Sequence, residues 1–157
     1  MSAPAYPLTL FRFRVEFEQV LPRAAGGGAP VALCEGAFSE CSGLEATMEP
    51  KVIKAGGANY GAAQRVGQVT FGTVILKRGM TTNRDLWRAF SGVSERGFSA
   101  TRFNVAITVL GPGGEPAFTV RLSRAMPVKF KCGDLSARAT EVGVEELHLA
   151  HEGMTLA

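Results

Sequence analysis

The sequence lacks the segments that would carry a chain into or across a membrane. No stretch approaches the roughly 20 consecutive apolar residues that a membrane-spanning helix needs. Near the amino terminus, Arg12 and Arg14 interrupt the only apolar stretch, whereas a secretion signal requires an unbroken apolar core. We therefore expect a soluble protein that is made in the cytoplasm and has no membrane anchor of its own.

Cysteine and histidine are also scarce, with three and two residues respectively. Cys34, Cys41 and Cys132 are odd in number and show no C-x-x-C spacing, which argues against a disulfide framework or a zinc site. We expect these thiols to be reduced and buried. His148 and His151 are three residues apart and would lie on opposite faces of a strand, so they cannot hold a metal ion together.

Motifs of the common enzyme and nucleotide-binding classes are absent as well. The chain has neither the G-x-x-x-x-G-K-[ST] loop that cradles phosphates nor the G-x-S-x-G turn of serine hydrolases. His151-Glu152 begins the zinc motif H-E-x-x-H, but Thr155 occupies the position of the second histidine. We predict no catalytic residue, no cofactor and no metal ion, and therefore no enzyme.

Glycine and proline, in contrast, are plentiful, with 19 and 8 residues in a chain of 157. This composition predicts many turns and favours β structure. The length suits one domain, and we predict that residues 1–157 form a single one. The net charge of +3 is too small to demand a nucleic-acid partner.

Eight segments have the apolar spacing or the turn boundaries of strands. They cover residues 11–17, 31–41, 44–54, 69–77, 103–110, 117–122, 128–132 and 140–150. The turn dipeptide Ser42-Gly43 predicts that the second and third segments form a hairpin. Segment 69–77 is apolar on both faces, as in a covered central strand. The last segment changes phase, which predicts a bulge near Glu145-Glu146.

One further segment has the period of a helix. Leu86, Phe90 and Val93 follow at i, i+4 and i+7, and Thr82 with Asp85 forms a capping-box pattern. We predict a helix over about 83–94 that covers the central strand. The elements together predict a mainly β fold, a two-sheet β-sandwich or partly closed barrel with one flanking helix.

Two glycine-rich segments, about 22–30 and 55–67, predict flexible loops. The second is too long for a tight turn and too poor in apolar residues for a core, which is typical of a loop with a function. A sandwich of this kind also leaves edge strands, and partner subunits are one way to satisfy their unpaired backbone groups.

Seven short pieces of the sequence, taken in order, resemble the inner tube proteins of contractile phage tails and bacterial contractile injection systems. They are Phe38 to Leu44, Gly56 to Asn59, Leu76 to Thr81, Asp85 to Trp87, Arg102 to Val105, Ala125 to Phe130 and Glu145 to Gly153. The chain departs from that family in its longer Gly26-Gly27-Gly28 loop and in segment 62–67, where a more basic loop is usual.

The resemblance implies that six copies form a ring and that rings stack into a hollow rod inside a contractile sheath. The implied partners are further copies of the chain, the sheath protein, baseplate and tube-terminator proteins, and a lumen cargo that is a protein effector or DNA. The protein would be made in the bacterial cytoplasm and incorporated into a phage tail or an injection particle.

This resemblance suggests two sets of assembly residues. Segment 31–54 is expected to supply part of the inner barrel, because its weak alternation suits strands with one wet face. The lumen candidates are Glu40, Glu45, Glu49 and Lys51. The self-assembly candidates, from the loop 55–67 and the turn into the helix, are Gly56, Gly57, Asn59, Tyr60, Arg65, Lys77 and Arg78.

Two other functions stay open at this point. A specialised ring at the baseplate, which starts the tube, would share the same sequence pattern. A basic β-barrel that binds nucleic acid would place cations on phosphates, and its candidates are Arg65, Lys77, Arg78, Lys129 and Lys131. Long rods of purified protein would indicate a main tube protein, and short rings an initiator.

Overall fold

A computed structural model describes residues 12–20, 38–54, 56–57, 60–95, 102–138 and 140–157, which form eleven strands and one helix. The elements are β1 (Phe13–Val20), β2 (Glu40–Ser42), β3 (Ala46–Met48), β4 (Lys51–Ile53), β5 (Ala63–Arg65), β6 (Val69–Phe71), β7 (Val74–Gly79), α1 (Asp85–Glu95), β8 (Arg102–Leu110), β9 (Pro116–Lys131), β10 (Val144–Ala150) and β11 (Gly153–Leu156). The mainly β fold with one flanking helix, predicted from the sequence, is confirmed. The predicted loop 22–30 and Cys34 lie outside the described residues.

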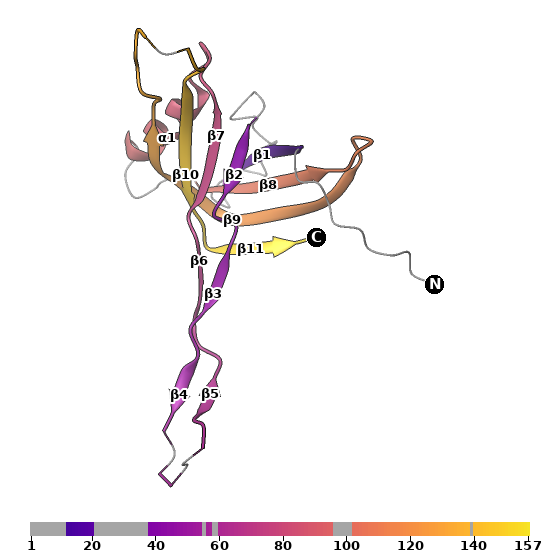
Figure 1. Ribbon diagram of the computed structural model, residues 1–157, viewed down its shortest axis with the longest axis vertical. Coiled ribbons are helices and arrows are strands. Elements are labelled where there is room, and N and C mark those ends of the chain that lie inside the picture. Colours follow the sequence, from indigo (N-terminus) through magenta and orange to yellow (C-terminus); the bar gives the residue numbers. More distant parts are fainter. Residues whose placement is uncertain (1–11, 21–37, 55, 58–59, 96–101, 139) are drawn as a thin grey trace.

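The body has two antiparallel layers that share strand β9 (Figure 1). The first layer contains β1, β8, the first part of β9, and β11, and the second contains the rest of β9 with β10, β7 and β2. One apolar core fills the space between them, and its fully buried side chains include Val105, Leu122, Leu76 and Leu147. Such orthogonal layers turn their other faces outward.

Strand β9 passes from one layer to the other at Arg124, whose φ of 50° is the only positive value among the described residues other than glycine. The Asn104 Oδ1 atom accepts a hydrogen bond from the Arg124 backbone N–H at 3.3 Å, and Arg124 Nε lies 2.8 Å from Glu152 Oε2. These contacts hold a left-handed backbone conformation that costs an arginine energy.

The sequence predicted two strands where β9 is one, and that prediction is wrong. Pro127, expected to open a new strand, lies buried within β9 opposite Leu149. The ladder with β10 shifts register between His148 and Leu149, so the missing N–H of the proline falls at an irregularity in the ladder.

The predicted bulge at Glu145-Glu146 is also wrong, because β10 keeps one phase throughout. Glu145, Leu147 and Leu149 are all buried, while Glu146 and His148 face outward. The sequence suggested a change of phase because Val142 and Val144 were expected on the same face as Leu147 and Leu149, whereas both valines are exposed. Glu145 instead points inward and pairs with Arg78.

Helix α1 covers one end of the core and begins two residues later than predicted. Asn83 Oδ1, rather than the predicted Thr82, accepts a hydrogen bond from the Asp85 backbone N–H at 3.2 Å. Leu86 is fully buried, as the spacing predicted. Trp87 is half exposed and its ring centroid lies 5.5 Å from that of Phe130 in β9. In the part of the chain that the structure describes, no helix is long and apolar enough to cross a membrane.

The described residues between 45 and 72 form a two-stranded ribbon, here called the arm, that extends away from the body (Figure 1). The predicted hairpin between 31–41 and 44–54 is therefore wrong. Strands β3 and β4 pair with β6 and β5, so the expected loop 55–67 contains a strand, and β2 pairs with β7. The expected central strand 69–77 is interrupted at Gly72-Thr73, where the arm meets the body.

Candidate assembly interfaces

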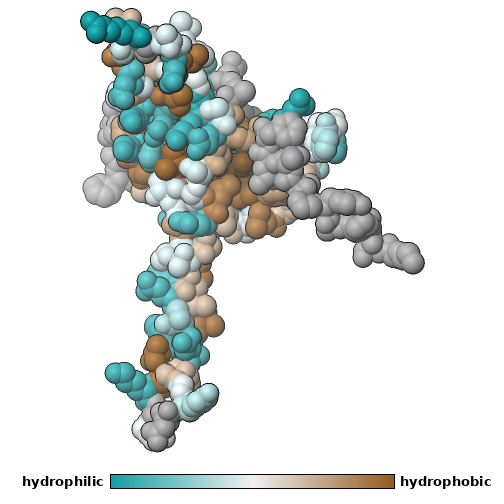
Figure 2. Space-filling view, viewed as in Figure 1, coloured by the Kyte–Doolittle hydropathy of each residue, from teal (hydrophilic) through white to brown (hydrophobic). Residues whose placement is uncertain are grey.

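The arm exposes apolar side chains that have no core to enter. Val52, Val66 and Tyr60 are 56%, 80% and 100% exposed. Figure 2 shows apolar and polar side chains mixed along the whole arm, with no second layer of protein beside it. An isolated two-stranded hairpin is at best marginally stable in water. The arm therefore has the properties of a segment that is stabilised by contact with another chain.

The distal part of the arm is basic. Lys51 and Arg65 lie directly opposite each other in the β4–β5 ladder, and Lys54 follows at the end of β4. Like charges directly opposite each other across a ladder are destabilising. None of the three forms an ion pair with any residue that the structure describes.

The first layer ends in two edge strands, β1 on one side and β11 on the other. Ala157 and Thr119 exchange both backbone hydrogen bonds at 2.9 Å, so the N–H and C=O of the preceding residue, Leu156, point away from β9. On β1, Leu110 N–H donates to the Arg12 carbonyl at 2.9 Å, so Phe13 and Val15 direct their backbone groups away from β8. Each edge presents an alternating row of donors and acceptors.

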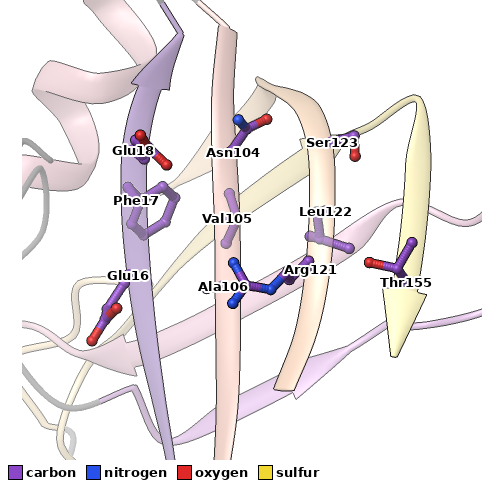
Figure 3. Close-up of a pocket in the computed structure, with 10 residues that line it drawn as sticks. All are labelled: Glu16, Phe17, Glu18, Asn104, Val105, Ala106, Arg121, Leu122, Ser123 and Thr155. Atoms are coloured by element: carbon purple, nitrogen blue, oxygen red, sulfur yellow. The ribbon is translucent and has the colours of Figure 1, made fainter. Parts of the chain in front are cut away.

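The outer face of the first layer is polar and combines charged side chains with short ones. Figure 3 shows its shallow pocket, where the core residues Phe17, Val105 and Leu122 alternate with outward residues along each strand. The outward residues at the pocket are Glu16, Glu18, Asn104, Ala106, Arg121, Ser123 and Thr155. A face of this composition suits a water-filled space better than a dry protein contact.

The outer face of the second layer carries a row of alternating charge across four strands. Glu40, Lys77, Glu146 and Lys131 are successive neighbours in the ladders, and Lys77 Nζ lies 3.6 Å from Glu40 Oε1 and 4.0 Å from Glu146 Oε1. His148 Nε2 lies 3.1 Å from Glu146 Oε2, and this hydrogen bond, with the nearby lysines, lowers the pKa of Glu146. Exposed ion pairs of this kind contribute little stability individually.

A buried ion pair joins three elements of the body. Arg78, on the inner face of β7, is 3% exposed, and its Nε lies 2.5 Å from Glu145 Oε1 on β10. The Arg78 Nη1 atom is 3.7 Å from Asp85 Oδ2 in the first turn of α1. The guanidinium also lies 6.0 Å from the ring centroid of Phe38. These contacts fix the helix against the second layer.

The structure separates the residues predicted for assembly. Gly56, Gly57 and Tyr60 lie at the exposed arm tip and Arg65 on β5, while Asn59 lies outside the described residues. Lys77 lies on the outer face of the second layer, and Arg78 lies inside the protomer.

The lumen candidates are also divided. Glu40 belongs to β2, whereas Glu45, Glu49 and Lys51 lie on the arm. Sequence reasoning missed the free edges of β1 and β11 and the polar face between them. The strict alternation of segment 11–17 was a signal for a wet outer face, but strand order across the layer was needed to complete that face.

Other expected sites can now be placed. The described residues contain no cluster of three or more potential metal ligands. Cys41 is partly buried, and burial raises the pKa of its thiol to about 11, whereas Cys132 is exposed, contrary to expectation. The cations proposed for nucleic acid do not form one patch, because Arg78 is buried and Arg65 lies on the arm.

Comparison with known proteins gives a consistent group of matches. Residues 9–155 match the family described as T4-like virus tail tube protein gp19. A chain in the cryo-EM structure of the anti-feeding prophage baseplate, which was 6-fold symmetrised, is 30% identical with a TM-score of 0.77, and the match covers 100% of this chain and 97% of that one. No curated protein matches the chain.

Two chains from an extracellular contractile injection system, PVC, share the fold at 18% identity. The first belongs to the sheath-tube complex in the extended state, with a TM-score of 0.77 and coverage of 97% of this chain and 92% of that one. The second belongs to the sheath/tube terminator in the extended state, with a TM-score of 0.79 and coverage of 99% of both chains.

Proposed function

This chain belongs to the T4-like virus tail tube protein family, and we propose that six copies close into a ring and that rings stack into a hollow conduit inside a contractile sheath. The family is structural and non-enzymatic, and the protein is a tail tube component of a contractile phage tail or contractile injection particle. We also propose that residues 1–157 form a single domain with an extended arm.

The observation that best supports ring formation is the pair of free edge strands, β1 and β11, on the first layer. In this proposal, β1 of one copy pairs with β11 of its neighbour, so that the four strands of the first layer continue around the ring. Six copies would give about 24 strands, and barrels beyond about 16–18 strands leave an aqueous channel. Closure also removes both edges, which a free monomer would leave open to aggregation.

The polar outer face of the first layer would then line the channel. Arg121, Ser123 and Thr155 lie on this face, whereas Glu40, Glu45, Glu49 and Lys51 lie elsewhere. We therefore propose the first layer, in place of segment 31–54, as the lumen wall. Its mixture of acidic, basic and small side chains would allow a protein effector or DNA to pass without tight binding. In this proposal contraction of the sheath drives the tube and supplies the work, so no catalytic turnover is required.

The outer face of the second layer would turn toward the sheath. Its charged row from Glu40 to Lys131 crosses four strands and is open to a partner. The related chains in sheath-tube, terminator and baseplate assemblies support the same set of partners for this protein. The buried Arg78 would contribute to assembly indirectly, because it holds α1 on the second layer.

Removing the arm tip tests the assembly role of the arm. Deletion of 56–61 should leave the body folded and should abolish rods, because the described residues of this stretch are all exposed and none belongs to the core. Negative-stain electron microscopy measures the rods, and a thermal melt by circular dichroism measures the fold. Unaltered rods in the deleted protein would exclude a role for the tip.

A baseplate-proximal initiator ring is a second candidate, and one observation favours it. Identity is 30% to the chain from a baseplate but 18% to the chains from a sheath-tube complex and a terminator. Purified protein at high concentration should grow long rods if it is the main tube protein. An initiator should stop at single rings and then extend only when a separate tube protein is added. Electron microscopy with and without that second protein distinguishes the two.

A further inference from the structure

The end of the body opposite the arm also exposes apolar side chains. They lie on and beside the β9–β10 loop, residues 132–143, at the far end of the molecule from the arm tip (Figure 1). Leu135 and Val142 are 88% and 76% exposed, and Val144 at the start of β10 is also exposed. Large apolar side chains that are this exposed would gain free energy by burial against another protein.

The base of this loop is held in place. Met80 N–H donates a hydrogen bond to the Gly143 carbonyl at 2.8 Å. A Cβ atom on Gly133 would lie 2.7 Å from the Val144 carbonyl oxygen, so only glycine permits this close approach. The two ends of the loop are therefore packed together beside Met80, and the base of the loop has a defined position on the body.

The loop and the arm carry complementary charge. Asp134 and Glu141 are exposed on the loop, and neither forms an ion pair with a described residue. Arg138 is the one cation of the loop's described residues, so the loop is acidic overall. The distal arm presents Lys51, Lys54 and Arg65, together with exposed Val52 and Val66. Each surface combines apolar side chains with charges that have no ion-pair partner among the described residues.

We propose that the arm of one copy docks on the β9–β10 loop of a second copy in the adjoining ring, with Lys51 and Arg65 facing Asp134 and Glu141. The inference rests on the proposed ring and names the surface that receives the arm. The two surfaces differ and lie at opposite ends, so the contact is head to tail and repeats without limit along an axis. A single acidic partner would also relieve the repulsion between Lys51 and Arg65 across their ladder.

The length of the arm suits this contact. From Glu45 to Lys54 each leg spans roughly 30 Å at about 3.3 Å per residue. That length places the basic distal part of the arm well beyond the body of its own protomer, as Figure 1 shows. Apolar contact from Val52 and Val66 would supply affinity, and the charges would set the register between rings.

Charge reversal with rescue tests the proposal. The double variants Lys51→Glu/Arg65→Glu and Asp134→Lys/Glu141→Lys should each form rings but reduce sedimentable rods by about tenfold or more, because like charges would then face each other. Combining all four changes should restore rods, since the pairing is then reversed as a whole. Arg88→Glu, an exposed charge change on α1, is the matched control and should leave rods unchanged.

The possible outcomes distinguish a failure of the arm–loop contact from a failure of the proposed function. Rods that persist in either double variant, or a fourfold variant that fails to recover them, would overturn the arm–loop contact while ring formation still stands. If the wild-type protein forms only single rings, the arm does not bind a second copy of this chain, and the proposed partner of the arm is wrong. Wild-type protein that forms neither rings nor rods under any condition would instead contradict the proposed function.

Discussion

The Glu145→Ala variant should lose about 3–5 kcal/mol of unfolding free energy, which is the usual effect of leaving one charge of a buried ion pair without its partner. Arg78 is 3% exposed and cannot reach water when the Glu145 carboxylate is removed. Asp85 Oδ2, at 3.7 Å from Arg78 Nη1, is too distant for a good hydrogen bond, but its charge places the expected loss near the lower end of that range. Urea unfolding followed by tryptophan fluorescence measures this loss of unfolding free energy, since Trp87 lies on α1, the helix that the buried ion pair holds against the second layer.

Two further variants test whether the loss of the ion pair, and no other change, explains the lower stability of Glu145→Ala. Lys77→Ala changes the residue beside Arg78 on the opposite face of the same strand, where the ion pairs are exposed, and should cost no more than about 1 kcal/mol. Replacing the group with Arg78→Met, Glu145→Leu and Asp85→Asn removes all three buried charges, since Asp85 would otherwise lose its ion pair with Arg78, and should recover most of the stability lost in Glu145→Ala. A triple variant as unstable as the single one would show that packing, and not the stranded charge, explains the loss.

The sequence correctly predicted the elements whose signal lies entirely within their own residues. Alternation of apolar residues in segment 11–17 identified β1, and the apolar i, i+4 spacing of Leu86 and Phe90 identified α1, because both signals are local. The turn at 111–114 joined β8 to β9 for the same reason. These elements were sufficient to predict the mainly β fold with one helix.

Strand partners could not be predicted in the same way. Segment 44–54 pairs with 63–71 to form the arm, but nothing in either segment distinguishes that pairing from a hairpin at Ser42-Gly43. Gly43 is needed for another reason, since its φ is 82° and a Cβ there would lie 1.9 Å from the Thr73 carbonyl oxygen. A glycine that permits close backbone approach and one that permits a hairpin turn look the same in a sequence.

The phase of β10 shows a second limit of prediction from the sequence alone. Val142 and Val144 were expected on the buried face, so a bulge was required to keep Leu147 and Leu149 inside, but both valines are exposed and Glu145 is buried. The buried partner, Arg78, lies 67 residues earlier in the chain. Burial of a charged residue depends on such distant partners, so single-sequence patterns misplace charged residues at the sites where they hold elements together.

The Leu156→Pro variant should fold as a monomer and fail to form rings. The Leu156 N–H points away from β9, so proline removes a donor from the free edge without breaking a hydrogen bond inside the protomer. The side chain is 68% exposed, which limits the loss of packing. If β1 of a neighbour pairs with this edge, one ladder bond is lost and the proline ring blocks close approach at all six joints of the ring. Size-exclusion chromatography with light scattering measures the loss of rings.

Leu156→Ala is the matched control, because it shortens the same side chain and keeps the backbone donor. Rings from the alanine variant together with monomers from the proline variant would locate the ring contact in the backbone of β11. A proline variant that still closes rings would mean that neighbours meet through side chains at another surface. The first layer would then keep its edges open, and the channel wall could not be the continuous barrel of β1, β8, β9 and β11 that these edges imply.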